Sequence, residues 1–222
     1  MKYYYEAYDE RYRQVHERNL QWASDAPSAI VSQVMNRWRI GPNAEILELG
    51  CGEGRDAAYL LGKGYDLTAT DISPEAIRYC RERWPEFAEH FRVLDCVGGE
   101  MNQKFDFIYV VAVVHMLVED AHRAGFYRFI REHLKDHAVA LVCTMGDGTM
   151  ERRSDITTAF ELQERTHGQS GEKLLLAGTS CRMVGWDTFL GEIRESGLNV
   201  TEYGLTEVPS DFPVMMYAVM GK

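Results

Sequence analysis

A short apolar run followed at once by three closely spaced glycines constrains the fold of this chain more than any other stretch. Residues 46–49 have the composition of a strand buried on both faces, as in a parallel sheet. Gly50, Gly52 and Gly54 then allow the backbone to turn tightly and to approach a ligand, and helical spacing resumes over residues 56–61. A strand, a glycine turn and a helix N-terminus with unpaired N–H groups together indicate an α/β fold with a site for a nucleotide-like ligand.

The spacing inside the turn helps to choose among cofactors. A dinucleotide fingerprint would read Gly-x-Gly-x-x-Gly, but Arg55 occupies the position of its third glycine, and the actual third glycine comes one residue early. Glu53 also places a carboxylate inside the turn, which disfavours a pyrophosphate. S-adenosylmethionine, which carries a sulfonium and an ammonium group, suits such a turn better.

The motif Glu48-Leu-Gly-Cys-Gly-Glu-Gly54 resembles the acidic-x-Gly-x-Gly-x-Gly first motif of class I S-adenosylmethionine-dependent methyltransferases. Its continuation, Gly-Arg-Asp-Ala-Ala-Tyr-Leu and then residues 64–66, is similar to the thiopurine and tellurite-resistance branches, which act on small molecules. The resemblance implies a Rossmann-like, doubly wound α/β fold with a seven-stranded, mostly parallel sheet whose last strand is antiparallel. Alternating strand and helix patterns indicate a doubly wound α/β domain independently.

The expected layout is a single methyltransferase domain over residues 1–222, because the chain has no Pro/Gly/Ser-rich linker. Residues 1–40 are expected to form an N-terminal helical cap, with helices over about 8–23 and 27–39. Residues 44–220 form the Rossmann-like core. An insertion after strand five, residues 149–182, is expected to contain a helical piece over 159–167 and to act as a lid or to shape specificity.

Two acids follow strands at spacings that suit an adenosyl group. Asp71 ends the second expected strand, 21 positions after Gly50, where a carboxylate can accept both ribose hydroxyls. The resemblance implies that Asp95, after the third strand, binds the adenine amino group and that the end of strand four approaches the methionine part. The candidate cofactor-binding residues are Glu48, Gly50, Cys51, Gly52, Gly54, Arg55, Asp71, Ile72, Asp95, Cys96 and Val111.

Candidates for acceptor binding come from the N-terminus and from the end of the insertion. The tyrosine-rich N-terminus either packs on the core or forms a flap over the site, and it supplies Tyr4, Tyr8, Tyr12 and Trp22. Arg182, which closes the insertion, is either a surface residue or a guanidinium that holds an anionic acceptor.

A general base is needed only if the acceptor must lose a proton early; a thiol, amine or carboxylate acceptor needs none. His115 follows strand four and is either a structural histidine or a residue that faces the substrate. His115, Asp147 or a tyrosine could then serve as the base. His133 and His137 stand four apart, but no third ligand is near in the sequence, so we interpret them as surface residues and predict no metal.

Charge and composition narrow the class of protein. The formal net charge is −10 and no long basic run occurs, which disfavours a nucleic-acid substrate. Five cysteines without Cys-x-x-Cys spacing are typical of reduced thiols in a cytoplasmic protein. No run approaches the ~18 apolar residues that a membrane span needs. The expected partner is a small-molecule acceptor, with anionic molecules among the candidates. The oligomeric state does not follow from the sequence.

The sequence therefore predicts an S-adenosylmethionine-dependent methyltransferase that acts on a small molecule. Two alternatives stay open. One is a nicotinamide-dependent oxidoreductase, against which the glycine spacing argues. The other is a protein that binds S-adenosylmethionine without turnover, because the binding motifs outnumber the catalytic ones.

Overall fold

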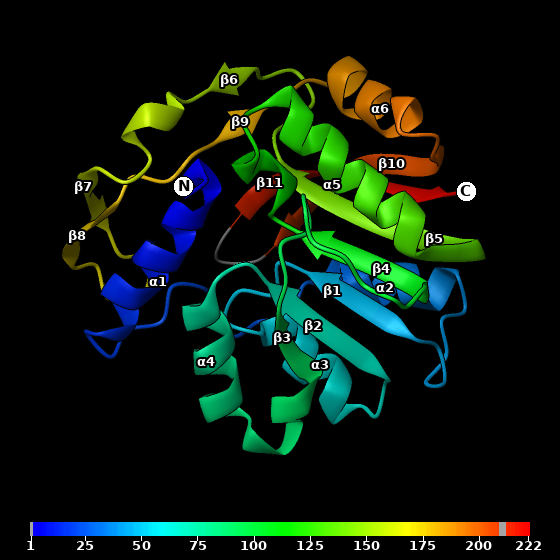
Figure 1. Ribbon diagram of the computed structural model, residues 1–222, viewed down its shortest axis with the longest axis horizontal. Helices are drawn as coiled ribbons and strands as arrows, with labels where there is room; N and C mark the ends of the chain where they lie inside the picture. Colours follow the sequence, from blue (N-terminus) through cyan, green and yellow to red (C-terminus); the bar gives the residue numbers. More distant parts are fainter. Residues whose placement is uncertain (1, 209–211) are drawn as a thin grey trace.

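A central seven-stranded sheet organises the molecule (Figure 1). The computed structural model describes residues 2–208 and 212–222, so residues 209–211 of the predicted 44–220 core lie outside the described residues. The strand order is β10-β11-β5-β4-β1-β2-β3, and β11 runs antiparallel to both of its neighbours while the other pairs are parallel. This confirms the predicted fold class. The strands are β1 (Ile46–Leu49), β2 (Leu67–Asp71), β3 (Phe91–Val93), β4 (Phe105–Val111), β5 (Leu134–Met145), β10 (Asn199–Val208) and β11 (Phe212–Gly221).

Helices cover both faces of the sheet. They are α1 (Ala7–His16), α2 (Ala29–Arg37), α3 (Arg55–Gly62), α4 (Pro74–Arg83), α5 (Asp120–His133) and α6 (Trp186–Glu195), with 3₁₀ turns η1 (Tyr4–Glu6), η2 (Pro85–His90), η3 (Val114–Met116) and η4 (Ile156–Thr158). Apolar residues of α5 and α6 pack on one face, and those of α2, α3 and α4 pack on the other.

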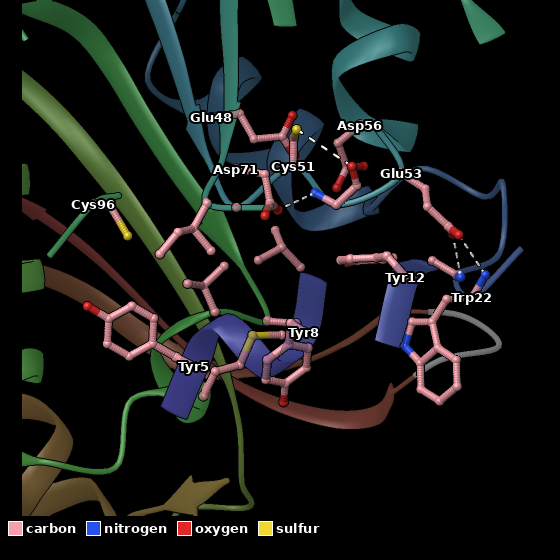
Figure 2. A pocket seen from close by; sticks show the side chains of 18 of the residues that line it. Tyr5, Tyr8, Tyr12, Trp22, Glu48, Cys51, Glu53, Asp56, Asp71 and Cys96 are labelled. Carbon is pink, nitrogen blue, oxygen red and sulfur yellow. Dashed lines mark hydrogen bonds between the residues drawn. The ribbon is translucent and has the colours of Figure 1, made fainter. Parts of the chain in front are cut away.

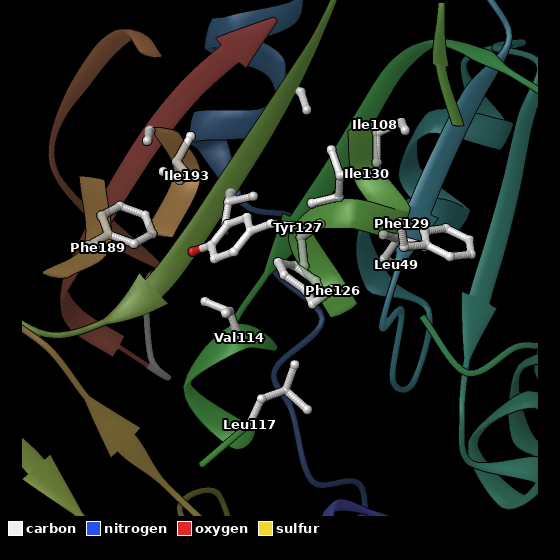
Figure 3. Close-up of a cluster of buried hydrophobic side chains, with 14 of the residues drawn as sticks. Leu49, Ile108, Val114, Leu117, Phe126, Tyr127, Phe129, Ile130, Phe189 and Ile193 are labelled. Atoms are coloured by element: carbon white, nitrogen blue, oxygen red, sulfur yellow. The ribbon is translucent and has the colours of Figure 1, made fainter. Parts of the chain in front are cut away.

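Alternation along the strands divides the core between these two faces. In β4, Ile108 and Val110 belong to the α5–α6 side, whereas Phe107 and Tyr109 belong to the opposite side. Figure 3 shows the first cluster, in which aromatic rings of α5 and α6 meet side chains of β1, β4 and η3. Strands with two buried faces fix where their loops begin, so the ends of β1, β2 and β4 form a common floor.

Local capping explains where two helices begin and end. The Ser73 side chain accepts a hydrogen bond from the Ala76 N–H and Pro74 follows, so α4 begins as predicted. After α6, Gly197 has a φ of +83°, which an L-residue rarely adopts.

The N-terminal helix is shorter than predicted. α1 ends at His16, and Asn19 turns the chain in the left-handed region with a φ of 56°. The backbone N–H groups of Trp22 and Ala23 are donated to Glu53 instead of continuing a helix. The prediction of a helix over 8–23 was therefore wrong in its second half, because a tertiary partner outcompetes the next turn. The second helix begins at Ala29, later than predicted.

The helical piece predicted at 159–167 was also wrong. Residues Leu162–Thr166 form β7, which pairs antiparallel with β8 (Lys173–Ala177) around a turn at 168–171. Charged residues in this stretch favour a helix, but pairing with β8 overrides local propensity. At the base of the insertion, β6 (Arg152–Arg153) pairs with β9 (Arg182–Met183).

His133 is buried, which corrects its interpretation as a surface residue. Its Nδ1 lies 2.8 Å from the Phe129 carbonyl oxygen and its Nε2 lies 3.0 Å from that of Met101, so the ring ties α5 to the loop before β4. His137 is exposed, as predicted. Cys51, Cys80 and Cys143 are buried, and within residues 2–208 and 212–222 all five cysteines are free thiols. Over the same ranges, no helix combines the length and the apolar character that a membrane crossing requires.

Candidate active site

A cavity of about 380 Å³ lies at the carboxyl ends of β1, β2, β3 and β4, under α1 and the insertion. Ligands of open α/β sheets bind at this edge. Its lining comes from the glycine turn, the loops after β2, β3 and β4, the N-terminal segment and the insertion. The described lining residues are Tyr5, Tyr8, Tyr12, Trp22, Ala23, Glu48, Gly50, Cys51, Gly52, Glu53, Arg55, Asp56, Asp71, Ile72, Leu94, Asp95, Cys96, Val97, Val111, Ala112, Val113, Met116, Leu117, Thr166, Gly168 and Phe212.

The glycine turn is held in a conformation that side chains would prevent. Gly50, Gly52 and Gly54 have φ values of 73°, 53° and 76°. A Cβ at Gly50 would stand 2.2 Å from Cγ2 of Val113, and one at Gly52 would stand 2.7 Å from the Tyr12 hydroxyl oxygen. The turn therefore brings bare backbone to the cavity at the N-terminus of α3.

Asp71 joins the glycine turn to the start of α4. Its carboxylate accepts hydrogen bonds from the Gly52 N–H at 2.8 Å and the Ser73 N–H at 2.9 Å. Burial raises the pKa of Asp71, and these backbone hydrogen bonds oppose that rise only in part. Two carboxylate oxygens have about four lone-pair sites, so acceptor capacity remains toward the cavity.

The other end of the cavity is mainly apolar and surrounds Asp95. The Asp95 carboxylate accepts from the Val97 N–H at 2.8 Å, and the Tyr5 hydroxyl donates to it at 3.4 Å. Ile72, Leu94 and Cys96 form walls beside it. Figure 2 shows Tyr5 and Cys96 on one side of Asp71, and Tyr12, Trp22 and Glu53 on the other.

Two buried glutamates flank the turn. Glu48 is 3% exposed, and its Oε2 has no hydrogen-bond partner among the described residues. Burial and the nearby Asp56 charge raise the pKa of Glu48 well above its usual range. Glu53 accepts from the Trp22 and Ala23 N–H groups, both at 2.7 Å, and thus fixes one wall of the cavity.

Most residues predicted to bind the cofactor lie together in this cavity. Of the eleven residues predicted to bind the cofactor, Gly54 is the one outside the described cavity lining, and it is the N-cap of α3. Of the predicted acceptor residues, Tyr8, Tyr12 and Trp22 line the cavity. The Tyr8 hydroxyl donates to the Ser180 carbonyl oxygen at 3.0 Å, which ties α1 to the insertion.

Four other predicted residues are absent from the described cavity lining: Tyr4, Arg182, Asp147 and His115. The Tyr4 hydroxyl accepts from the Val118 and Glu119 N–H groups. Arg182 pairs with Asp120 and donates to the Val118 carbonyl oxygen.

Asp147 caps its own turn, and hydrogen bonds from the Thr149 and Met150 N–H groups lower its pKa. His115 is 3% exposed behind the Phe212 ring, with 6.1 Å between centroids. Burial and the Arg123 charge lower the pKa of His115 to about 3, so the imidazole is neutral.

Several lining residues were missed from the sequence. Tyr5 belongs to the tyrosine cluster that the sequence singles out, and Glu53 stands in the glycine motif itself. Leu117, Thr166 and Phe212 offer no local signal, because only the tertiary fold brings them to the cavity.

The sheet order, the glycine turn after β1 and the acids that follow β2 and β3 define a class of protein. They are the features of the class I S-adenosylmethionine-dependent methyltransferases, and residues 46–137 match the family model of a methyltransferase domain. The matched stretch runs from β1 into β5 and contains the glycine turn, Asp71 and Asp95. The predicted family and cofactor, S-adenosylmethionine, are thereby confirmed.

Individual relatives support the same class. The chain is 31% identical over 123 residues to a malonyl-(acyl-carrier protein) O-methyltransferase of Acetivibrio thermocellus, covering 54% of this chain and 41% of that protein. It is 28% identical over 110 residues to "Probable S-adenosyl-L-methionine-dependent methyltransferase TehB" of Haemophilus influenzae, covering 48% and 37%. The chain thus spans less than half the length of both curated relatives.

A solved structure shares the fold over nearly the whole chain. The 1,6-didemethyltoxoflavin-N1-methyltransferase of Burkholderia thailandensis, with bound 1,6-didemethyltoxoflavin and S-adenosylhomocysteine, superposes with a TM-score of 0.66 at 18% identity. The match covers 95% of this chain and 84% of that one.

Proposed function

We propose that this protein transfers a methyl group from S-adenosylmethionine to a small, uncharged acceptor molecule. The observation that carries the proposal is the single cavity that brings together the glycine turn, Asp71 and Asp95. Along the cavity, the glycine turn would fit the methionine part of the cofactor, Asp71 its ribose and Asp95 its adenine.

The proposed orientation places adenine at the apolar end. Ile72 and Leu94 would contact its faces, and Asp95 would accept from its amino group. Asp71 would accept from the ribose hydroxyls, because it stands midway between the two ends. The N-terminus of α3 and Arg55 would take the carboxylate of the methionine part.

Glu48 suits the ammonium group of the same ligand. A buried carboxyl oxygen without a hydrogen-bond partner is costly, and a cation in the cavity would supply that partner. The raised pKa of Glu48 in the free protein would then fall on binding, so cofactor binding would release a proton wherever Glu48 is protonated.

The chain has a limited chemical task in this reaction. When bound, S-adenosylmethionine supplies a methyl group that its sulfonium already activates for in-line displacement. The floor of strand ends would align the reactants, and Tyr8, Met116 and Phe212, which line the cavity, would exclude water. Alignment of this kind can contribute about 7–11 kcal/mol to lowering the barrier.

The charge of the cavity favours an uncharged acceptor over an anion. Among the described lining residues, five carry carboxyl groups and one, Arg55, carries a guanidinium. Arg182, the candidate for holding an anion, pairs with Asp120 instead. Aromatic walls from Tyr8, Trp22 and Phe212 would suit a flat acceptor, and the structurally similar protein of Burkholderia thailandensis is named as an N1-methyltransferase.

The proposal includes no general base. Asp147 is exposed and engaged in its own turn, and His115 stands behind Phe212 as a neutral ring. Burial raises the pKa of Tyr12 well above 10, so its hydroxyl stays protonated. A neutral amine or ring nitrogen, which needs no proton removal before attack, fits these surroundings.

Calorimetric titration with S-adenosylmethionine, S-adenosylhomocysteine and NAD in parallel tests the cofactor. We expect the first two to bind and NAD to give no heat; NAD binding alone would refute the proposal. A panel of neutral amines, heteroaromatics, phenols and carboxylates, followed by release of S-adenosylhomocysteine, then tests turnover. Cofactor binding without product from any acceptor class would favour a non-catalytic protein.

A further inference from the structure

His16, the last residue of α1, connects three separate segments of the chain. Its Nε2 lies 2.9 Å from Glu53 Oε1 in the glycine turn, and its Nδ1 lies 2.7 Å from Glu75 Oε1 at the start of α4. The ring stacks on Tyr79 at 4.2 Å between centroids and on Tyr12 at 5.9 Å. The side chain is 4% exposed, so water does not compete for these contacts.

Both partners of the ring are carboxylates, which accept hydrogen bonds and cannot donate when ionised. A neutral imidazole donates from one nitrogen only, so two ionised partners are satisfied together only by the imidazolium. Burial lowers the pKa of His16, but hydrogen bonds to Glu53 and Glu75 outweigh burial and raise it above 6.5.

Other titratable side chains of α1 and α4 lie near His16 and its two carboxylate partners. On α4, Arg78 pairs with Glu75 at 2.6 Å and, with His16, lowers the pKa of Glu75. On α1, the Asp9 carboxylate accepts from the Glu75 N–H at 3.1 Å. Tyr12 and Tyr79, which sandwich the ring, have raised pKa values through burial and stay uncharged near neutrality.

The opposite side of α1 is fastened to the insertion. Arg11 is 7% exposed and donates to the carbonyl oxygens of Ala177 and Gly178. The Gln14 side-chain oxygen accepts from the Ala177 N–H at 2.8 Å. The helix therefore lies between the insertion and the cofactor floor, and Figure 1 shows α1 between α4 and the β7–β8 hairpin.

We propose that protonated His16 is a positioning residue that fastens α1 over the cavity, so that loss of its proton loosens this cap and weakens cofactor retention. It acts through Glu53, which also holds Trp22 and Ala23 at the wall of the cavity. The effect on cofactor retention rests on the proposed function, whereas the fastening of α1 does not depend on a ligand.

Hydrogen exchange of the full-length protein tests the fastening of α1 without any ligand. His16→Phe keeps a flat ring between Tyr12 and Tyr79 but removes both hydrogen bonds. We expect faster exchange over residues 7–16 at fixed pH, with unchanged exchange in β4. The matched control is His90→Phe, since His90 bonds only the Leu67 carbonyl oxygen among the described residues. Equal exchange of α1 in wild type and His16→Phe would overturn the proposal.

The pH dependence of S-adenosylhomocysteine affinity tests retention. Between pH 6 and pH 9, we expect the affinity of the wild type to fall by roughly fivefold to tenfold more than that of His16→Phe, at the lower end of typical site-to-site coupling. At pH 6 the variant should bind more weakly than the wild type. The comparison with the variant removes the titration of the ligand's own amine.

Glu75→Gln supplies an independent variant if His16→Phe folds poorly. Loss of one carboxylate makes the imidazolium less stable, so the pH midpoint should move downward. The same pH profile in all three proteins would contradict the role of His16. Failure of S-adenosylhomocysteine to bind the wild type at every pH would contradict the proposed function and the retention step, whereas the exchange experiment would still decide the fastening.

Discussion

The floor and the roof of the cavity are built by different means. The floor consists of the glycine turn and the loops after β2, β3 and β4, and backbone geometry holds it: Gly50 and Cys51 both donate N–H groups to the Thr70 carbonyl oxygen. The roof consists of α1 and the insertion, and side chains hold it, chiefly Arg11 and His16. Backbone geometry leaves little freedom, whereas a few side-chain contacts can open together, so we expect the floor to be rigid and the roof to move.

The largest effect is expected from an alanine in the floor. Gly50→Ala would place a Cβ in contact with Val113 in a left-handed conformation, and should lower the free energy of unfolding by about 2–4 kcal/mol. Cofactor binding should be lost. Chemical denaturation and calorimetry measure both, with Gly62→Ala as control, because a Cβ at Gly62 meets nothing within 4 Å. A Gly50→Ala protein of native stability would show that the floor is not rigid.

A smaller effect is expected from Asp71→Ala, which removes a charged hydrogen-bond acceptor from the floor. Cofactor affinity should weaken by about 1–3 kcal/mol, the scale of a lost charge-assisted hydrogen bond. Asp66→Ala, at an exposed position just before β2, serves as control. Unchanged affinity of Asp71→Ala by calorimetry would refute its proposed ribose contact.

In the roof, Arg11→Lys should have a more local effect. Lysine cannot reproduce the fork that donates to Ala177 and Gly178, so the insertion should exchange hydrogen faster, with a stability loss of about 1 kcal/mol. Arg13→Lys, on the exposed side of α1, is the control. If Arg11→Lys destabilised β1 and β4 as much as the insertion, floor and roof would unfold as one unit.

The smallest effect is expected from Arg182→Ala. Arg182 pairs with a largely exposed partner, Asp120, and such pairs contribute about 0–1 kcal/mol. We expect no change in cofactor affinity and little change in the Michaelis constant of an acceptor. A large rise in that constant would restore the guanidinium as an acceptor ligand and argue for an anionic substrate.

The floor could be predicted from the sequence and the roof largely could not. Gly50, Asp71 and Asp95 lie at or just after the ends of strands, so periodicity and spacing locate them. By contrast, Arg11 meets Ala177 across 166 positions, and nothing local indicates that pairing. His16 was missed for the same reason, because its partners come from two other segments.

The wrong predictions have the same origin. Residues 17–23 and 162–166 contain residues that favour helices, yet Glu53 and β8 supply better partners for their backbone groups. His133 was misplaced because the loop that covers it is distant in sequence.

The pairing of β6 with β9 has an evolutionary consequence. Ser154 and Cys181 exchange hydrogen bonds, so residues 155–180 leave the core and return to it at nearly the same point. A segment whose ends already touch can be lengthened, shortened or grafted at little entropic cost to the rest of the chain. Diversification of the acceptor could therefore proceed by exchange of this segment as a cassette, while the machinery for the methyl donor is inherited intact.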